Sequence, residues 1–268
     1  RYNAADNSFT AINRFDEIWL LGNEEYDVTA YYPHVGEEGT VPPVQTVEIT
    51  SENQDTPEER AAFDFLYAST KATKAEPNVH LNFNHAMSRV NLKFVPGTDP
   101  EGNPVTLTDI ECYLVGIKRN GTFDTETGVA AVAEDAAVSD LRQMLNADND
   151  YTFTAYLLPQ TIGAEGLLIE ATMRSTDGRR IYYSLEIPVS DWPEMKAGYS
   201  YNYTLTANDY TTPNDTPIVL EISGTDINPW TEVNKEETPD AKALGTEAYV
   251  NGAEWGEMEN EEIVPEVK

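Results

Sequence analysis

The sequence predicts an all-β protein with two tandem antiparallel β-sandwich domains, few short helices and a C-terminal extension. Short runs that alternate apolar and polar residues recur along the 268 residues, and clusters of Gly, Pro, Asn and Asp separate them. Alternation at every second residue is typical of strands with one buried and one solvated face. A chain of this length suggests two domains of about 100 to 200 residues each.

The alternation is clearest in the second half of the chain. Strands are predicted over residues 151–157, 167–173, 181–187, 199–205 and 218–222. Within 199–205 the odd positions carry Tyr199, Tyr201 and Tyr203. We interpret these tyrosines as core residues, and a sugar-stacking surface is the alternative.

The first half contains weaker strand patterns and both predicted helices. Strands are expected over residues 27–32, 44–50, 79–95 and 105–115. Thr56 followed by Pro57 is typical of a helix start, which predicts one or two helical turns. A second short helix is predicted over 139–145, because its apolar residues share one helical face.

The domain boundary is expected near this second helix. We therefore predict an N-terminal domain over residues 1–147, a C-terminal domain over residues 148–243 and an extension over residues 244–268.

The strand pattern in residues 79–95 changes face partway along. Phe83 and His85 fall on odd positions, whereas the apolar residues fall on even positions from Val90 onward. Because neighbouring residues of a strand point to opposite faces, a continuous strand cannot keep both sets buried. The sequence therefore predicts a bulge or a bend across residues 86–88.

The charge balance excludes two classes of partner. The chain carries 47 acidic and 17 basic residues, for a formal net charge of -30. Such a surface repels phosphate backbones and anionic lipid headgroups, so we expect no nucleic acid and no membrane as partners of the mature form. No stretch approaches the ~18 apolar residues of a membrane span. The chain opens with Arg1-Tyr2-Asn3 rather than with an apolar leader, which indicates a mature or trimmed form.

The sequence shows no catalytic constellation, and we expect neither an enzyme nor a cofactor. His80 and His85 are five residues apart, so on one strand they point to opposite faces and cannot share a metal. We interpret them as structural or hydrogen-bonding residues. Acidic turns such as 148–150 lack the spaced ligands of a dedicated calcium loop, although weak calcium binding stays an alternative. The single cysteine, Cys112, is expected to be buried.

The C-terminal segment combines a linker pattern with a final strand pattern. Residues 231–243 are rich in Glu, Lys, Thr and Pro, which is typical of a solvated linker. Apolar residues return afterwards, and 262–267 carry Ile263, Pro265 and Val267 on one side. Proline cannot donate a ladder hydrogen bond, so this segment is predicted as an edge or partly paired strand. A disordered acidic terminus is the alternative.

Several short motifs occur in an order that is similar to one family. Asp64-Phe65-Leu66-Tyr67-Ala68 precedes a Phe-x-His-x-x-Ser-x-Val pattern, and aromatic residues recur in the second half. The residues of this signature are Phe83, His85, Ser88, Val90, Trp192, Gly198, Tyr199, Tyr201 and Trp230. Their arrangement, which covers about residues 63–230, resembles the fimbrillin-like proteins of Bacteroidetes, the subunits of type V pili.

The resemblance implies both a structure and a mode of assembly. Fimbrillins have transthyretin-like sandwich domains, are exported through the outer membrane as lipoprotein precursors, and lose an N-terminal strand by proteolysis, often after an arginine. The groove that opens in the N-terminal domain accepts the C-terminal strand of the next subunit. Arg1 is therefore a candidate processing site, although cleavage after an arginine would leave that residue upstream. The donor strand would consist of Glu262, Ile263, Val264, Pro265, Glu266 and Val267.

The expected function is that of a structural subunit of a cell-surface pilus, or fimbrium. We expect a shaft or anchor pilin whose partners are other copies of itself or related pilins, together with host or bacterial surface ligands. Head-to-tail donation is heterologous, so it extends as a filament. The alternative is a non-polymerising surface lipoprotein or a tip adhesin that binds host or dietary glycans through exposed aromatic residues. An enzyme would need a carboxylate pair or a metal cluster in a cleft.

Overall fold

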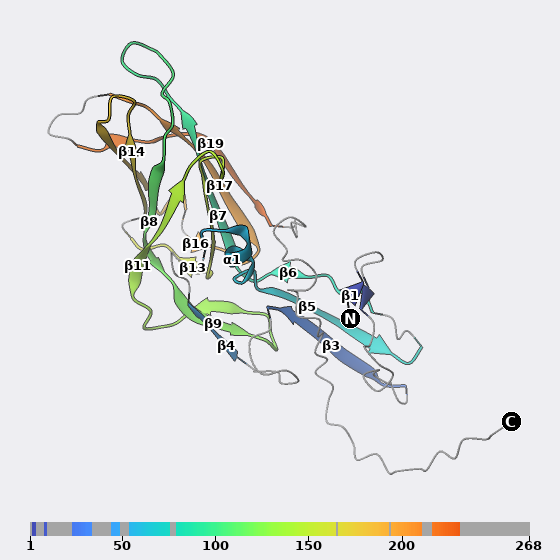
Figure 1. Cartoon of the computed structure of the whole chain (residues 1–268). Helices are drawn as coiled ribbons and strands as arrows, with labels where there is room; N and C mark the ends of the chain where they lie inside the picture. The colour runs from blue at the N-terminus through green and yellow to red at the C-terminus, as the bar shows by residue number, and fades with distance from the viewer. Residues whose placement is uncertain are drawn as a thin grey trace.

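The computed structural model of the chain is almost entirely β-structure, which confirms the predicted all-β class. It describes residues 2–3, 8–9, 23–33, 44–48, 54–75, 79–164, 166–192, 194–210 and 216–230. Figure 1 shows two larger sheets in the upper part of the view and smaller sheets below them. Within the described ranges, no helix is long and apolar enough to cross a membrane.

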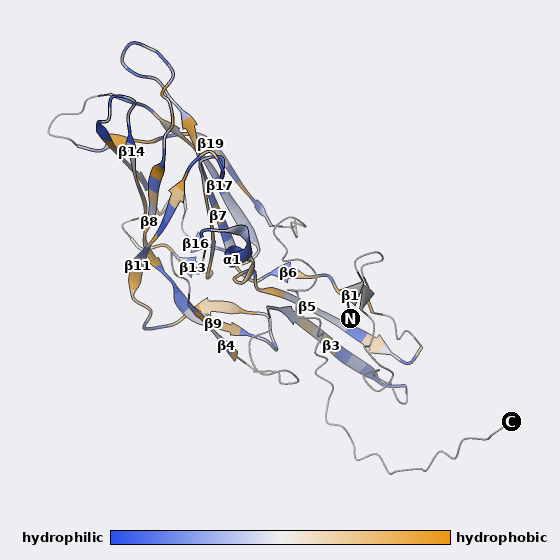
Figure 2. Cartoon of the chain, viewed as in Figure 1, coloured by the Kyte–Doolittle hydropathy of each residue, from blue (hydrophilic) through white to orange (hydrophobic). Residues whose placement is uncertain are grey.

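Five strands form the first of the larger sheets. In spatial order they are β11 (Val138–Leu145), β8 (Ile110–Lys118), β14 (Leu167–Arg174), β15 (Arg180–Ile187) and β18 (Ile218–Val219). Neighbours are antiparallel except for β15 and β18, which are parallel. In Figure 2 hydrophobic and hydrophilic stretches alternate along β8 and β11, as expected for a sheet with one buried face.

Four strands form the second larger sheet. Their order is β12 (Thr152–Leu157), β7 (Ser88–Pro96), β17 (Tyr199–Ala207) and β19 (Glu221–Pro229). β7 and β17 are parallel, and the other two pairings are antiparallel. Leu92 and Tyr203 of this sheet belong to the same buried cluster as Leu114 and Cys112 of the first, so the two sheets form a sandwich. Cys112 is buried, as predicted, and burial raises the pKa of its thiol.

The expected division into two tandem domains is not confirmed. β7 and β8 precede residue 147, yet β7 pairs with β17 and β8 pairs with β14. Strands from both halves of the chain therefore share both sheets and one buried cluster. Alternation in a sequence predicts where a strand lies, but it does not specify the distant strand with which it pairs.

Two three-stranded sheets adjoin the sandwich. One has the order β3 (Glu25–Tyr32), β5 (Leu66–Thr73) and β6 (Asn84–His85), and the other has the order β10 (Ala130–Val132), β9 (Asn120–Asp124) and β4 (Val44–Glu48). Phe65, just before β5, packs against Phe123 of β9 with ring centroids 4.8 Å apart. Two short pairings join β1 (Tyr2–Asn3) to β2 (Ser8–Phe9) and β13 (Gln160–Thr161) to β16 (Glu194–Met195).

The helix predicted after Thr56 is confirmed as α1 (Pro57–Ala61). The Thr56 hydroxyl oxygen accepts a hydrogen bond from the Glu59 N–H at 3.2 Å. In return, Glu59 Oε2 accepts from the Thr56 N–H at 2.8 Å. This reciprocal pair satisfies two backbone donors that a helix start would otherwise leave without partners.

The helix predicted over 139–145 is wrong, because this segment belongs to strand β11. Its buried residues are Leu141, Gln143 and Leu145, and the residues between them are exposed. Pairing with β8 satisfies the backbone and places Leu141 opposite Leu114. The apolar residues fit either a helical face or a strand face, and the available edge of β8 selects the strand.

The predicted break in the strand pattern across residues 86–88 is confirmed. β6 ends at His85 and pairs with β5, whereas β7 starts at Ser88 and pairs with β12 and β17. Ala86 and Met87 connect the two strands and are both buried. The chain passes here from a small sheet into the sandwich, and the core-facing side changes with it.

Two glutamine side chains bond to β12 as a neighbouring strand would. Gln143 Nε2 donates to the Thr154 carbonyl at 2.6 Å, and Gln143 Oε1 accepts from the Thr154 N–H at 3.0 Å. Gln54 makes the same two bonds to Tyr156, both at 2.7 Å. Each amide offers a donor and an acceptor, so it satisfies both backbone groups of one residue. A further strand cannot pair with β12 at these residues unless it displaces the amides.

Replacing Gln143 with leucine is expected to lower the free energy of unfolding by about 1–3 kcal/mol, because the Thr154 backbone groups lose their partners in the interior. Urea unfolding of the purified chain measures this change. Met144→Leu alters an exposed residue of the same strand and serves as the control, with a change of at most about 0.5 kcal/mol. Equal losses in the two variants would rule out a specific role for the amide.

Candidate functional site

The predicted site residues divide into two groups. The donor strand over 262–267 and the candidate processing residue Arg1 lie outside the described residues, so both stay predictions. The signature residues all lie within the described part, where most of them form two clusters.

The first cluster is a stack of rings where β6 ends. The His85 ring lies parallel to the Trp230 indole, with centroids 3.5 Å apart and 7° between the planes. His85 Nδ1 lies 2.5 Å from Asp64 Oδ1, and the guanidinium carbon of Arg89 lies 4.8 Å from the indole centroid. His85 and Trp230 are each only 5% exposed. Trp230 directly follows β19, so this stack fixes the point where that strand ends.

Backbone hydrogen bonds join signature residues that are far apart in the sequence. The Gly198 N–H donates to the Met87 carbonyl at 2.9 Å, and the Trp230 N–H donates to the Gly198 carbonyl at 2.6 Å. Gly198 has a φ of +69°, and a Cβ at this position would lie 3.2 Å from the His85 carbonyl oxygen. Any larger residue would therefore be strained here, which explains the glycine.

The second cluster lies in the core of the sandwich. Trp192 is 1% exposed and stacks on Tyr201 and Tyr203, with ring centroids 4.7 and 5.2 Å apart. The Tyr201 hydroxyl donates to the Glu194 carbonyl at 2.9 Å. Burial raises the pKa of the Tyr203 hydroxyl to about 12. These two tyrosines are core residues and do not offer a surface platform for sugars.

The remaining signature residues support the same packing. Ser88 and Val90 are buried on β7, and the Ser88 hydroxyl donates to the Lys196 carbonyl at 2.8 Å. Phe83 and Tyr199 are half-buried. The signature thus specifies how the second half of the chain is attached to the first.

The histidines and acidic turns show no metal site in the described ranges. His80 is exposed, whereas His85 is buried against Trp230. No group of three or more His, Cys, Asp or Glu residues in this part of the chain is placed to hold an ion. The acidic turn at 146–150 is held by internal hydrogen bonds, such as the one that the Asp148 N–H donates to Asn146 Oδ1 at 2.9 Å.

Among the described strands, β19 has one unpaired edge, and most of its residues are exposed. It pairs with β17 on one side, and no other described strand pairs with its second side. Ile222 and Ile227 lie opposite the buried residues Leu205 and Tyr201, yet they are 43% and 40% exposed. A strand edge with free N–H and C=O groups is able to receive a further strand. β19 therefore differs from β12, whose edge is closed by Gln54 and Gln143.

Comparison with known proteins agrees with this fold. The sequence matches a family model described as fimbrillin-like over residues 1–230. A putative cell adhesion protein from Bacteroides ovatus ATCC 8483 is 24% identical with a TM-score of 0.64, and the match covers 85% of this chain and 76% of that one. A second such protein, from Bacteroides uniformis ATCC 8492, is 20% identical with a TM-score of 0.58, with coverage of 77% and 74%. Both likenesses show a shared fold.

A search of curated proteins found no match. The family match over residues 1–230 extends across most of the chain and includes every signature residue. The chain therefore belongs to the fimbrillin-like family.

Proposed function

We propose that this chain is a non-enzymatic structural subunit of a cell-surface type V pilus, or fimbrium. The observation that carries the proposal is the fimbrillin-like match over residues 1–230. The structures with a similar fold from two Bacteroides species are described as putative cell adhesion proteins, which supports a place at the cell surface. The subunit is a shaft or anchor pilin, and it reaches the surface as a lipoprotein precursor that is trimmed near Arg1.

Assembly proceeds head to tail by strand donation. The segment from Glu262 to Val267 adds to a neighbouring subunit through main-chain hydrogen bonds, and its alternate side chains set the register. Ile263, Val264 and Val267 insert into the N-terminal half of that neighbour, while Glu262 and Glu266 stay at the rim. Because donor and acceptor are different surfaces, each addition leaves a new acceptor free and the assembly extends as a filament.

The N-terminal half contains an edge strand that suits an acceptor. Among the described strands, β3 pairs only with β5, so the other side of β3 has no described strand beside it. Val28 and Ala30 of β3 are buried, so a strand added beside β3 would continue an existing core. β12 is a poor acceptor by comparison, because Gln54 and Gln143 occupy its backbone groups.

Deleting residues 260–268 is expected to abolish filaments and to leave the monomer folded with an unchanged melting temperature. A buried aliphatic side chain contributes about 1.5–3 kcal/mol, so the loss of three anchors weakens association by several orders of magnitude. Electron microscopy of the assembled material and thermal unfolding of the monomer measure the two effects.

The matched control for this deletion is the double variant Glu262→Gln, Glu266→Gln, which keeps the apolar anchors and should keep the filaments. Normal fibres from the deletion would refute strand donation through this segment. Loss of the folded monomer would instead place the segment in the core of its own subunit, which also contradicts the proposal.

Trp230→Ala, unlike the deletion of residues 260–268, is expected to destabilise the folded monomer, because it removes the ring that stacks on His85 at the end of β19. Truncating a buried tryptophan to alanine typically costs about 3–5 kcal/mol of unfolding free energy. Urea unfolding should therefore detect a large destabilisation in this variant and none in the deletion of 260–268. A Trp230→Ala variant as stable as the parent would show that the ring stack does not hold β19 in place.

A further inference from the structure

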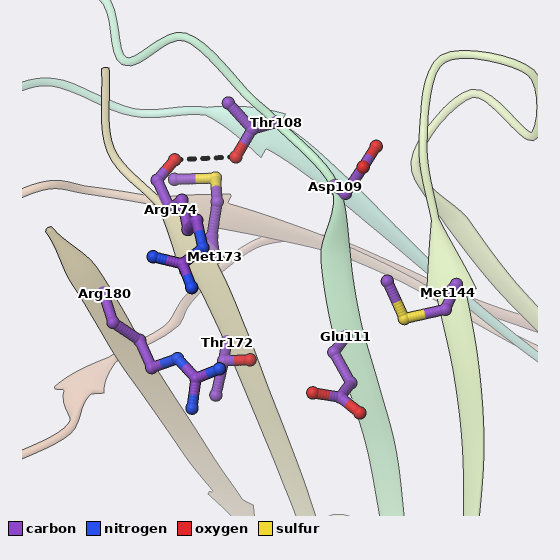
Figure 3. Close-up of a pocket in the computed structure, with 8 residues that line it drawn as sticks. All are labelled: Thr108, Asp109, Glu111, Met144, Thr172, Met173, Arg174 and Arg180. Carbon is purple, nitrogen blue, oxygen red and sulfur yellow. Dashed lines mark hydrogen bonds between the residues drawn. The ribbon is translucent and has the colours of Figure 1, made fainter. Parts of the chain in front are cut away.

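A shallow hollow of about 240 Å³ lies on the outer face of the five-stranded sheet (Figure 3). The residues that give it its chemical character are Asp109, Glu111, Met144, Thr172, Arg174 and Arg180. Figure 3 shows the two arginines coming from neighbouring strands on one side, with the two acidic residues and Met144 on the other. The volume is below the roughly 300–1,000 Å³ of sites for drug-sized ligands, so it suits one small group such as a single sugar.

The two arginines of the hollow lie directly opposite each other on β14 and β15. Like charges in such a cross-strand pair destabilise a sheet, so the fold itself does not favour this pairing. Several other cations of the described chain pair with carboxylates, as Arg142 does with Glu111 at 2.6 Å. Neither Arg174 nor Arg180 forms such an ion pair within the described residues, although the chain carries 47 acidic residues.

The Glu111 carboxylate on the other side of the hollow stays ionised and able to accept hydrogen bonds. Glu111 accepts from Arg142 Nε at 2.6 Å and from the Tyr113 hydroxyl at 2.8 Å. The bonds from Arg142 and then Tyr113 lower the pKa of Glu111. Each carboxylate oxygen has two lone pairs, so Glu111 keeps free acceptor sites for a ligand. Asp109 adds a second exposed acceptor.

Apolar side chains lie in the hollow and beside it. Met144 is 43% exposed, and the nearby Tyr182 is 41% exposed, with the Arg180 guanidinium carbon 6.0 Å from its ring centroid. Aromatic faces and exposed methionines offer contact area to the C–H groups of a sugar ring.

We infer that this hollow binds an acidic saccharide, a sugar unit that carries a carboxylate or a sulfate group. The guanidinium groups of Arg174 and Arg180 hold the oxyanion, because their fork geometry matches planar oxyanions in two-point hydrogen bonds. Glu111 and Asp109 accept hydrogen bonds from the sugar hydroxyl groups. This site lies on the face of a sheet, so it does not depend on the proposed strand donation at the edges.

An acidic peptide, such as the Glu-rich C-terminal segment of another copy, fits the same arginines less well. Glu111 and Asp109 would repel its carboxylates, and a glutamate side chain offers no hydroxyl groups to these two acceptors. A saccharide carries one negative charge and several hydroxyl donors, which matches both sides of the hollow.

The test is an amide chemical-shift titration of the isotope-labelled full chain with glucuronic acid and with glucose 6-sulfate. We expect saturable shifts at residues 108–111 and 172–182, and no saturation with neutral glucose at the same concentrations. Arg174→Gln and Arg180→Gln should each weaken binding about tenfold or more, because each removes charge-assisted hydrogen bonds. Arg180→Lys keeps the charge but loses the fork, and it should bind more weakly than the parent.

The matched control is Arg179→Gln, which removes one charge from the same hairpin but from a side chain that pairs with Asp209. It should leave the affinity for both sugars unchanged. Binding of acetate and inorganic sulfate as tight as that of the sugars would reduce the hollow to an anion site and overturn the inference. Tighter binding of a synthetic peptide of residues 253–268 would assign the hollow to the tail, and an absence of saturable shifts would remove the site altogether.

Discussion

The parallel pairing of β7 with β17 is the contact on which the rest of this structure depends. It places β7 and β17 at the centre of the four-stranded sheet, so that β12 and β19 attach only through them. The pairing joins segments that are far apart, as the bond from Arg89 Nε to the Ser200 hydroxyl, 111 residues away, illustrates. Closing such a long loop is entropically costly and slow, so the contact needs strong local support. Met87, Gly198 and Trp230 supply it with hydrogen bonds at the start of the pairing.

Local features of the fold were predictable from the sequence, whereas the pairing of distant strands was not. The break at 86–88 and the start of α1 follow from patterns within a few residues, and both are confirmed. The helix over 139–145 was wrong because Leu141 and Leu145 lie on one side of a helix and equally on one face of a strand. The order of the motifs in the sequence identified the signature residues. The contacts that these residues make around Gly198 depend on the register between β7 and β17, which the sequence does not specify. Gln143 alternates in sequence with Leu141 and Leu145, so the pattern indicates a polar residue on the buried face of the strand. Nothing in the sequence identifies Thr154 as its hydrogen-bond partner.

The strand edges show how such a subunit is able to receive a strand without general aggregation. An unpaired edge binds any suitable strand, so a protein that assembles through one edge must protect the others. Here the protection of β12 comes from two side-chain amides that occupy the same backbone groups a strand would use. The net charge of -30 adds a general repulsion between copies, which only a specific and extensive contact overcomes. Under the proposed strand donation, the closed edge of β12 would direct an incoming strand to β3 or to the unpaired edge of β19.

The contacts of the arginines that form no ion pair also bear on function. Several described cations neutralise no carboxylate, and some of these make another contact instead. Arg89 lies over Trp230 and supports the core, which accounts for its position. The Arg180 guanidinium carbon lies 6.0 Å from the Tyr182 ring centroid and Arg174 Nη1 donates to the Gly178 carbonyl at 3.4 Å, and both arginines line a hollow on the sheet surface. Because strand addition uses edges while this hollow lies on a face, a filament would repeat the hollow at every subunit, and weak binding of one sugar would become strong through multivalency.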